Sequence, residues 1–223
     1  MEYLGGVVLI KSIIWDFDGT LFDTYPAMVH AFKKGLKDSG VEAEEDEILK
    51  YMKISVTEAI NHFKEKYKLN DDFIQRYVYY EHNLQPRDIM LFPYAKEICD
   101  EFQKNGGRNF LLTHRGDSTF NYLKYHGMSE YFEEVVTRKN CFKRKPDPEG
   151  FTYLMDKYSL NCEEVLVVGD RECDILGGKN SKAKTCLFNT NNIDFYFDTD
   201  FKISSLLDLA NILGLDNLLK EKE

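Results

Sequence analysis

The chain has 223 residues, 43% of them apolar, which is enough for one sizeable core or for a core with a small second domain. Its 29 Lys and Arg residues stand against 38 Asp and Glu residues, and the formal net charge of -9 argues against nucleic acid and anionic membrane surfaces as general partners. The five cysteines are scattered and show no CxxC spacing, so we expect neither a disulfide framework nor a zinc site, and we predict a cytoplasmic protein.

The chain opens with an apolar segment, MEYLGGVVLI. It carries an acid at Glu2 and no basic residue before Lys11, so we do not expect a signal peptide. Two interpretations stay open, an extra strand and a loose extension. The chain contains no run of about 18 apolar residues, and no membrane-spanning helix is predicted.

The first predicted strand lies in the segment IIWDFDGTLFDT, residues 13–24, and ends in Asp16 and Asp18 with Gly19 directly behind them. Two like charges this close repel each other, and each carboxylate costs free energy to desolvate unless a cation compensates it. An ordinary turn at Asp18 with a helix cap at Asp16 is the alternative. A structural role alone explains the arrangement poorly.

The region from Tyr25 to Asp88 shows helical patterns only. The predicted helices cover residues 27–40, 45–52, 55–67 and 71–84, and the third begins with the capping-box spacing of Ser55 and Glu58. Aromatic residues at helical spacing in this block are interpreted as packing in preference to a pocket lining, namely Phe63, Phe73, Tyr77 and Tyr80. We therefore predict a helical subdomain at residues 23–88, inserted into a core made of residues 1–22 and 89–223.

The rest of the chain alternates short apolar runs with amphipathic stretches. The expected strands are residues 109–113, 134–137, 165–170 and 184–188, and the expected helices are residues 93–107, 118–128, 147–159 and 204–213. This alternation predicts an α/β fold with a doubly wound parallel sheet.

Polar groups follow several of these strands. The second strand ends at Thr113, the fourth ends at Asp170 with Asp174 four residues later, and Lys145 lies in the loop KRKPDP after the third. Open α/β sheets bind their ligands at the carboxyl ends of the strands, so these groups should meet there with Asp16. Carboxylates, a hydroxyl and an ammonium group together suit a divalent metal and a phosphate.

The string DFDGTLFDT resembles the first motif of the haloacid dehalogenase-like (HAD) superfamily. Thr113, Lys145 with KPDP, and the string GDRECD follow in the order of the remaining three motifs, and the helical insert lies where a C1-type cap belongs. The resemblance implies a Rossmann-like core, a mobile cap, and Mg2+-dependent phosphoryl transfer through an aspartyl phosphate. In cap class and motif spelling the chain is most similar to phosphoglycolate phosphatases.

The chemistry of the residues agrees with this resemblance. Asp16 is the expected nucleophile, and Asp18, on the same side of an extended chain, is the expected general acid and base. Asp16, the backbone carbonyl of Asp18, and Asp170 are the expected ligands of Mg2+. Lys145 and the Thr113 hydroxyl are expected to stabilise the charge on the transferred phosphoryl group.

Other positions keep two interpretations. His114 stands where the family often has Asn, and it either binds the leaving group or only packs. Lys53, between two predicted helices, is either a substrate-specificity residue or a solvated charge. Asp174 is expected to orient metal-bound water or Lys145. Gly169 stands where mutases related to β-phosphoglucomutase carry an extra acidic ligand, which favours a phosphatase.

We therefore predict a magnesium-dependent phosphatase that hydrolyses a small phosphorylated metabolite. The alternatives are a β-phosphoglucomutase-like phosphomutase and a non-catalytic binding module on the same fold, although such a module would be expected to have lost one of the motif residues. We expect no nucleic-acid or membrane partner, and either a monomer or a homodimer. The identity of the substrate is not predicted.

Overall fold

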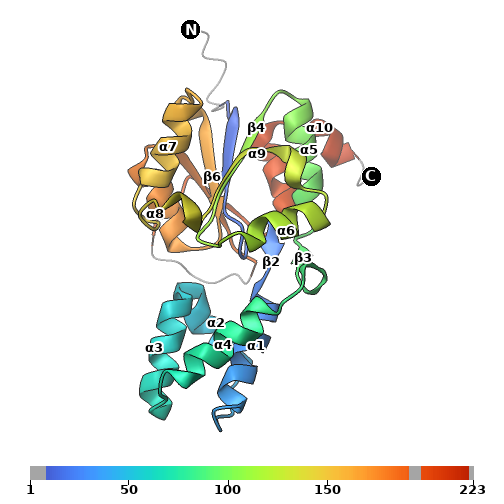
Figure 1. Cartoon of the computed structure of the whole chain (residues 1–223). Helices are drawn as coiled ribbons and strands as arrows, with labels where there is room; N and C mark the ends of the chain where they lie inside the picture. The colour runs from blue at the N-terminus through green and yellow to red at the C-terminus, as the bar shows by residue number, and fades with distance from the viewer. Residues whose placement is uncertain (1–8, 191–196, 221–223) are drawn as a thin grey trace. The chain divides into compact units, whose positions relative to one another are not determined.

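A computed structural model of the chain describes residues 9–190 and 197–220 (Figure 1). The first eight residues lie outside this range, and with them most of the apolar opening segment. The chain divides into two compact units, one made of Met1–Phe22 with Leu91–Glu223, the other of Asp23–Met90. None of the described helices has the length and apolar character that crossing a membrane requires.

The first unit is built on a parallel sheet, which has six strands in the described part of the chain, in the order β5-β4-β1-β6-β7-β8. Its strands are β1 (Ser12–Trp15), β4 (Arg108–Leu112), β5 (Phe132–Val136), β6 (Val165–Gly169), β7 (Lys184–Phe188) and β8 (Phe201–Ile203). The central strands β1 and β6 are buried along their whole length, as expected for a sheet covered on both faces.

Helices cover the two faces of this sheet (Figure 1). α7 (Glu149–Lys157) and α8 (Glu172–Asn180) lie on one face, and α5 (Ala95–Lys104), α6 (Ser118–Tyr125), α9 (Leu209–Leu213) and α10 (Asp216–Lys220) lie on the other. Five single 3-10 turns are described as well, at Pro86–Asp88, Ser129–Tyr131, Arg138–Asn140, Cys162–Glu164 and Leu206–Asp208. The predicted Rossmann-like α/β fold is confirmed.

The order in which the strands are added to the sheet reverses direction at β1. After β1 it forms β4 and β5 on one side, and it then returns to form β6, β7 and β8 on the other side. Trp15 pairs in register with both Leu111 and Val168, so the residues that follow these strands come out at one edge of the sheet. Such a switch point is where open α/β sheets bind ligands.

The second unit is all helical in its interior, with α1 (Tyr25–Lys37), α2 (Glu45–Ile54), α3 (Val56–Tyr67) and α4 (Asp72–His82). The predicted start of the third helix is confirmed, since Ser55 Oγ accepts a hydrogen bond from the Glu58 amide at 3.0 Å. Phe63, Phe73 and Tyr77 are buried in an apolar cluster and Tyr80 packs against it, which confirms the packing interpretation. At the boundary of the two units, the short strands β2 (Phe22–Asp23) and β3 (Met90–Leu91) pair with each other.

The elements with the weakest patterns differ from the prediction. The expected helix at residues 204–213 is a 3-10 turn followed by α9, which ends at Leu213 with Gly214 as its C-cap, and α10 begins at Asp216. Gly214 has a φ of 67, a left-handed conformation that glycine adopts without steric cost and that ends the helix. The two-residue strands β2 and β3 and the edge strand β8 were not predicted, because they are too short to show a period of two.

Candidate active site

Asp16 and Asp18 leave the end of β1 on a tight turn. The Asp16 amide still donates to the Val168 carbonyl at 2.9 Å, and the Phe22 amide donates to the Phe17 carbonyl at 3.0 Å. The Phe17 ring is fully buried and stacks on Phe22 with ring centroids 4.2 Å apart. Gly19 has a φ of 79, which allows the reversal. Phe17 thus points into the core while its two acidic neighbours lie at the sheet edge.

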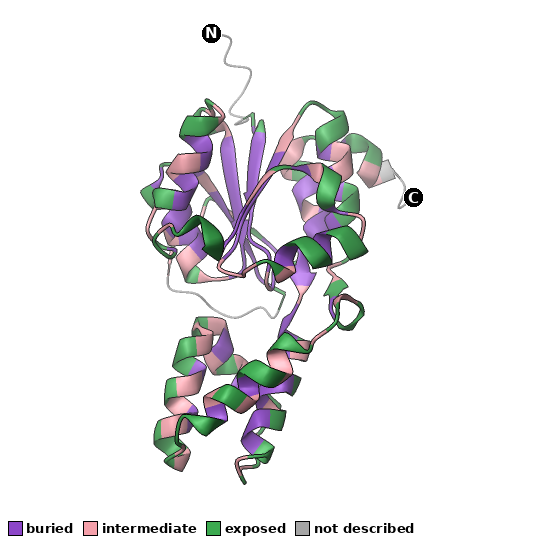
Figure 2. Cartoon of the chain, viewed as in Figure 1, coloured by how far each residue is buried: buried purple, intermediate pink, exposed green. Residues whose placement is uncertain are grey.

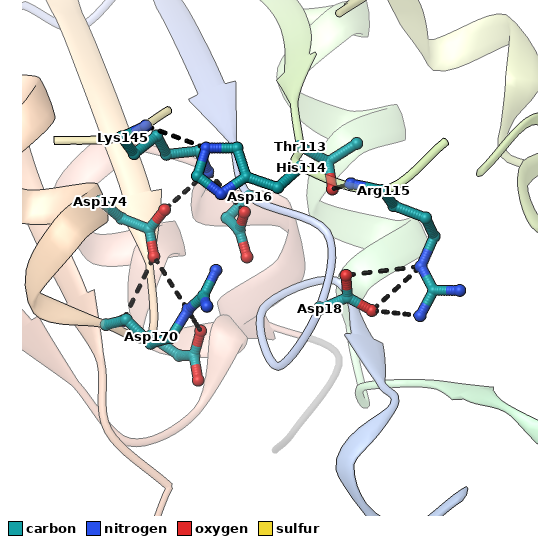
Figure 3. A network of polar contacts seen from close by, with 9 residues as sticks. Asp16, Asp18, Thr113, His114, Arg115, Lys145, Asp170 and Asp174 are labelled. Carbon is teal, nitrogen blue, oxygen red and sulfur yellow. Dashed lines mark hydrogen bonds and ion pairs between the residues drawn. The ribbon is translucent and has the colours of Figure 1, made fainter. Parts of the chain in front are cut away.

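Lys145 links the carboxylates of two different motifs (Figure 3). Its Nζ donates to Asp16 Oδ1 at 2.5 Å and to Asp174 Oδ1 at 2.6 Å. The Lys145, Asp16 and Asp174 side chains are 3%, 2% and 0% exposed. A buried charge of this kind is tolerated only when opposite charges and hydrogen bonds compensate it.

The pKa values of these groups follow from burial and from each other. Burial, followed by the charge of Asp174, raises the pKa of Asp16 to about 6. Burial alone would lower the pKa of Lys145, but the charges of Asp16 and Asp174 raise it above its ordinary value. Burial would raise the pKa of Asp174, but Lys145 and then Arg171 lower it below its ordinary value. Of the two carboxylates, Asp16 and Asp174, the ionised form of Asp16 therefore costs more free energy, and an additional cation would offset more of that cost at Asp16.

The acids at the ends of β1 and β6 fit a divalent metal. Ligand oxygens of Asp16, Asp170 and Asp174 lie within 4.8 Å of one another, and all three residues are buried. Within the described residues Asp16 Oδ2 is buried and has no hydrogen-bond partner. An unsatisfied buried carboxylate oxygen costs free energy, and a hard cation such as Mg2+ prefers oxygen ligands of this kind. The donor set therefore fits the Mg2+ that the sequence predicts.

The residue before Asp170 has no room for a side chain. A Cβ atom on Gly169 would lie 2.3 Å from the Cβ of Asp174, and both positions are on rigid elements, the end of β6 and the first turn of α8. An additional acidic ligand at position 169 is thus incompatible with Asp174 in its present place. Arg171, which the sequence analysis did not single out, lies with its Nε 3.8 Å from Asp170 Oδ1 and 3.9 Å from Asp174 Oδ2.

The end of β4 contributes Thr113 and His114. Thr113 is 2% exposed and its Oγ1 accepts a hydrogen bond from the Arg115 amide at 3.1 Å. His114 Nε2 accepts a hydrogen bond from the Lys145 amide at 2.9 Å. Burial, followed by the charges of Lys145 and Arg144, lowers the pKa of His114 to about 3, so the ring is neutral at neutral pH. His114 thus holds the backbone of Lys145 as a neutral acceptor.

Asp18 is paired with Arg115, a residue that the sequence analysis did not identify (Figure 3). Arg115 Nη2 donates to Asp18 Oδ1 at 2.7 Å, and Arg115 Nε lies 3.2 Å and 3.4 Å from Oδ1 and Oδ2. The Asp18 carboxylate points toward Arg115, whereas Asp16 is bound by Lys145. The sequence did contain a signal for Arg115, because it is a cationic residue two positions after Thr113, at the end of a strand that was already expected to contribute to the site.

Lys53 belongs to α2 in the helical unit. Its Nζ lies 5.3 Å from the centroid of the Tyr25 ring, and its charge lowers the pKa of Asp23, which burial raises more strongly. Near Thr113 and Lys145 there is a small cavity of about 60 Å3, lined also by Phe142 and Arg144.

The chain matches the model of a protein family described as haloacid dehalogenase-like hydrolase over residues 13–188. It is 26% identical over 215 residues to the pyrophosphatase PpaX of Oceanobacillus iheyensis, covering 92% of this chain and 97% of the relative. It is 28% identical over 228 residues to a phosphoglycolate phosphatase of Vibrio parahaemolyticus, with 92% and 97% covered.

The solved structures include a similar fold in YfnB from Bacillus subtilis, a HAD-hydrolase whose crystal is bound to magnesium. The TM-score is 0.75, the identity is 19%, and 92% of this chain and 99% of that chain are covered.

The fold, the four strand-end motifs and these matches define the class of protein. The chain belongs to the haloacid dehalogenase-like hydrolase family. The prediction of an enzyme, a phosphatase of this family, is confirmed.

Proposed function

We propose that this protein is a magnesium-dependent phosphatase that hydrolyses a small phosphorylated metabolite through an aspartyl phosphate on Asp16. The observation that carries this proposal is the state of the Asp16 carboxylate. Its Oδ1 is held by Lys145, its Oδ2 is buried without a hydrogen-bond partner among the described residues, and Asp170 and Asp174 are close by. A carboxylate held in this way is oriented as a nucleophile.

Each residue then has one task. An Asp16 oxygen attacks phosphorus, the bond from phosphorus to the leaving oxygen breaks, and Asp18 donates a proton to that oxygen. Water next attacks phosphorus while Asp18 accepts its proton, the bond from phosphorus to the Asp16 oxygen breaks, and inorganic phosphate leaves with the Asp16 carboxylate regenerated. Lys145 and the Thr113 hydroxyl stabilise the negative charge of the phosphoryl oxygens in both steps.

Asp16, Asp170 and the backbone carbonyl of Asp18 are the groups proposed to hold Mg2+. When bound, the metal supplies positive charge that offsets the carboxylates and orients the phosphoryl group. Asp174 orients Lys145 through the 2.6 Å contact. The likeness to a magnesium-bound hydrolase of the same fold supports this part of the proposal.

The substrate class rests on the relatives. PpaX is a pyrophosphatase by name and the Vibrio relative is a phosphoglycolate phosphatase, so small phosphorylated metabolites, including pyrophosphate and phosphoglycolate, are the first to test. The lack of space at Gly169 favours a phosphatase over a mutase with an acidic ligand there. Lys53 is retained as a proposed specificity residue. The five cysteines are free thiols, which supports a reducing cytoplasmic location.

The test compares Asp16→Asn with Asp18→Asn. Both variants are mixed with acetyl phosphate, whose leaving group needs little protonation, quenched rapidly and analysed by mass spectrometry. Phosphate is expected on Asp16 in the Asp18 variant and nowhere in the Asp16 variant. Asp156→Asn, which changes an exposed acid, is the matched control and keeps wild-type turnover.

Two results would contradict the proposal. One is substantial turnover by Asp16→Asn, or phosphate mapped to another residue. The other is full activity of the wild-type protein after exhaustive treatment with EDTA, because Asp16 and Asp170 can adopt their proposed roles only when a cation offsets their charge.

A further inference from the structure

Arg115 is held by more contacts than a solvent-exposed cation at a strand end would have. Its side chain is 7% exposed, and its guanidinium carbon lies 5.5 Å from the centroid of the Phe17 ring and 5.3 Å from that of Tyr122. Guanidinium groups stack favourably on aromatic faces. Two aromatic rings therefore lie against the guanidinium group.

The backbone of Arg115 is fixed as well. Its amide donates to Thr113 Oγ1 at 3.1 Å, and its carbonyl accepts from the Arg138 amide at 3.0 Å. The first contact joins it to the end of β4, and the second joins it to the segment after β5. Arg115 is thus immobilised at both its backbone and its side chain.

Asp18, in contrast, lies on the turn after β1 and is 21% exposed. Two guanidinium nitrogens contact its carboxylate, with Nη2 at 2.7 Å from Oδ1 and Nε at 3.2 Å from the same oxygen. A contact through two nitrogens fixes the direction of a carboxylate as well as its position. The rigid partner in this pair is Arg115, and the group that it orients is Asp18.

We propose that Arg115 is a positioning residue that sets the place and direction of the Asp18 carboxylate relative to the leaving oxygen of a substrate on Asp16. This inference rests on the proposed function, in which Asp18 is the general acid and base. A general acid must lie within hydrogen-bond reach of the atom that it protonates, so an error of about 1 Å in its position lowers the rate. Lys in place of Arg115 keeps the charge but loses the planar two-point contact.

The leaving group gives the readout. The variants Arg115→Met and Arg115→Lys are compared with wild type on a series of aryl phosphates, from phenyl phosphate to 2,4-dinitrophenyl phosphate, by rapid-quench measurement of Asp16 phosphorylation. Phenolate leaves poorly without a proton, whereas dinitrophenolate leaves unaided.

For Arg115→Met we expect a loss of about 10- to 100-fold with phenyl phosphate and less than about 3-fold with the dinitrophenyl ester. KM should change little, because Arg115 acts on Asp18 and not on the substrate. Arg115→Lys should recover part of the loss. In an Asp18→Asn background, Arg115→Met should cause no further loss, because the group that it orients is gone.

The chain offers a matched control at the other end of the same strand. Arg108 also contacts a carboxylate through two nitrogens, at 2.7 Å and 2.6 Å from Glu133, and its guanidinium carbon lies 5.3 Å from the centroids of Phe110 and Tyr158. Arg108→Met removes the same kind of pair away from Asp16, and it should leave the leaving-group dependence unchanged.

Equal losses across the whole ester series, or a further loss from Arg115→Met in the Asp18→Asn background, would overturn the positioning role. If Arg115→Met does not fold, as judged by the fluorescence of Trp15, Arg115→Lys is used for the same test. Its rate loss should then depend on the leaving group in the same direction, but less strongly. Failure of the proposed function itself is seen separately, since the wild-type protein would then form no aspartyl phosphate on Asp16 with the dinitrophenyl substrate.

Discussion

Both units of this protein contain buried residues (Figure 2), but the two units bury different kinds of side chain. In the helical unit an apolar cluster surrounds Phe32, whose ring centroid lies 5.4, 5.0 and 5.1 Å from those of Phe63, Phe73 and Tyr77. No charged side chain of residues 23–90 is buried. The α/β unit, in contrast, buries Asp16, Lys145, Asp170 and Asp174 together.

This difference separates stability from chemistry. Apolar packing stabilises a fold in proportion to the area that it buries, and it requires only apolar side chains of suitable shape and size. A cluster of buried charges stabilises little, since desolvation offsets the mutual attraction, but such clusters are typical of functional sites. Substitutions in the two units should therefore change stability in opposite directions, and three predictions test this.

The largest expected effect on stability is a loss in the helical unit. Phe32→Ala removes a fully buried ring from the centre of the aromatic cluster, and we expect the free energy of unfolding to fall by about 3–5 kcal/mol. Urea unfolding is followed by far-UV circular dichroism and by the fluorescence of Trp15, the single tryptophan, which is buried in β1 of the α/β unit.

If the units unfold separately, the dichroism transition moves to lower urea concentration while the Trp15 transition moves less. The matched control is Tyr79→Ala, which removes a ring that is 64% exposed and should cost less than about 0.5 kcal/mol. A loss as small in Phe32→Ala as in the control would show that the aromatic cluster does not stabilise this unit.

The second effect has the opposite sign. Burial and Asp174 raise the pKa of Asp16 to about 6, so the ionised carboxylate destabilises the metal-free fold at neutral pH. Asp16→Asn removes this charge, keeps an oxygen for Lys145, and should stabilise the protein in EDTA by about 1–3 kcal/mol.

The pH dependence checks the cause of this gain. A raised carboxyl pKa means that the cost is fully present above about pH 6 and disappears as the pH falls through 3.8, below which Asp16 is protonated in both the folded and the unfolded protein. The advantage of Asp16→Asn should shrink over the same range, and added Mg2+ should reduce it at neutral pH by binding wild type better. Equal stability of the two proteins at every pH would show that burying the ionised Asp16 carboxylate does not destabilise the fold.

The same contrast explains what the sequence could predict. Period and composition predicted the helices of the insert and the buried strands, because each long element repeats its pattern several times. Strand ends in an α/β fold converge on one edge, so Asp16, Thr113, Lys145 and Asp170 could be grouped without coordinates.

The pairings within the site could not be predicted. Nothing in the sequence assigns Asp18 to Arg115, or the Lys145 amide to His114, because these contacts depend on the paths of the loops after β1, β4 and β5. A Thr-His-Arg string after a strand offers three polar groups, and only the fold decides which neighbour each one meets. Strand β8 was missed for a different reason, since three residues at a sheet edge carry no recognisable period.

The smallest effect concerns His114, which the site keeps neutral. Burial and the charges of Lys145 and Arg144 lower its pKa to about 3, so between that value and its ordinary value of 6.5 the unfolded chain binds a proton that the folded protein does not. The free energy of unfolding of the wild-type protein should therefore fall as the pH drops below 6.5, and the loss should be about 1 kcal/mol or less near pH 5.5.

His114→Gln keeps an acceptor for the Lys145 amide but cannot titrate. The free energies of unfolding of the two proteins are compared by urea unfolding in EDTA. Their difference should be constant above pH 6.5 and should grow in favour of His114→Gln below that pH. Asp16 is present in both proteins, so its opposite contribution cancels in this difference. A constant difference across the whole range would mean that His114 takes up its proton in the folded protein as readily as in the unfolded chain, and the site would then contain a cation where we infer a neutral acceptor.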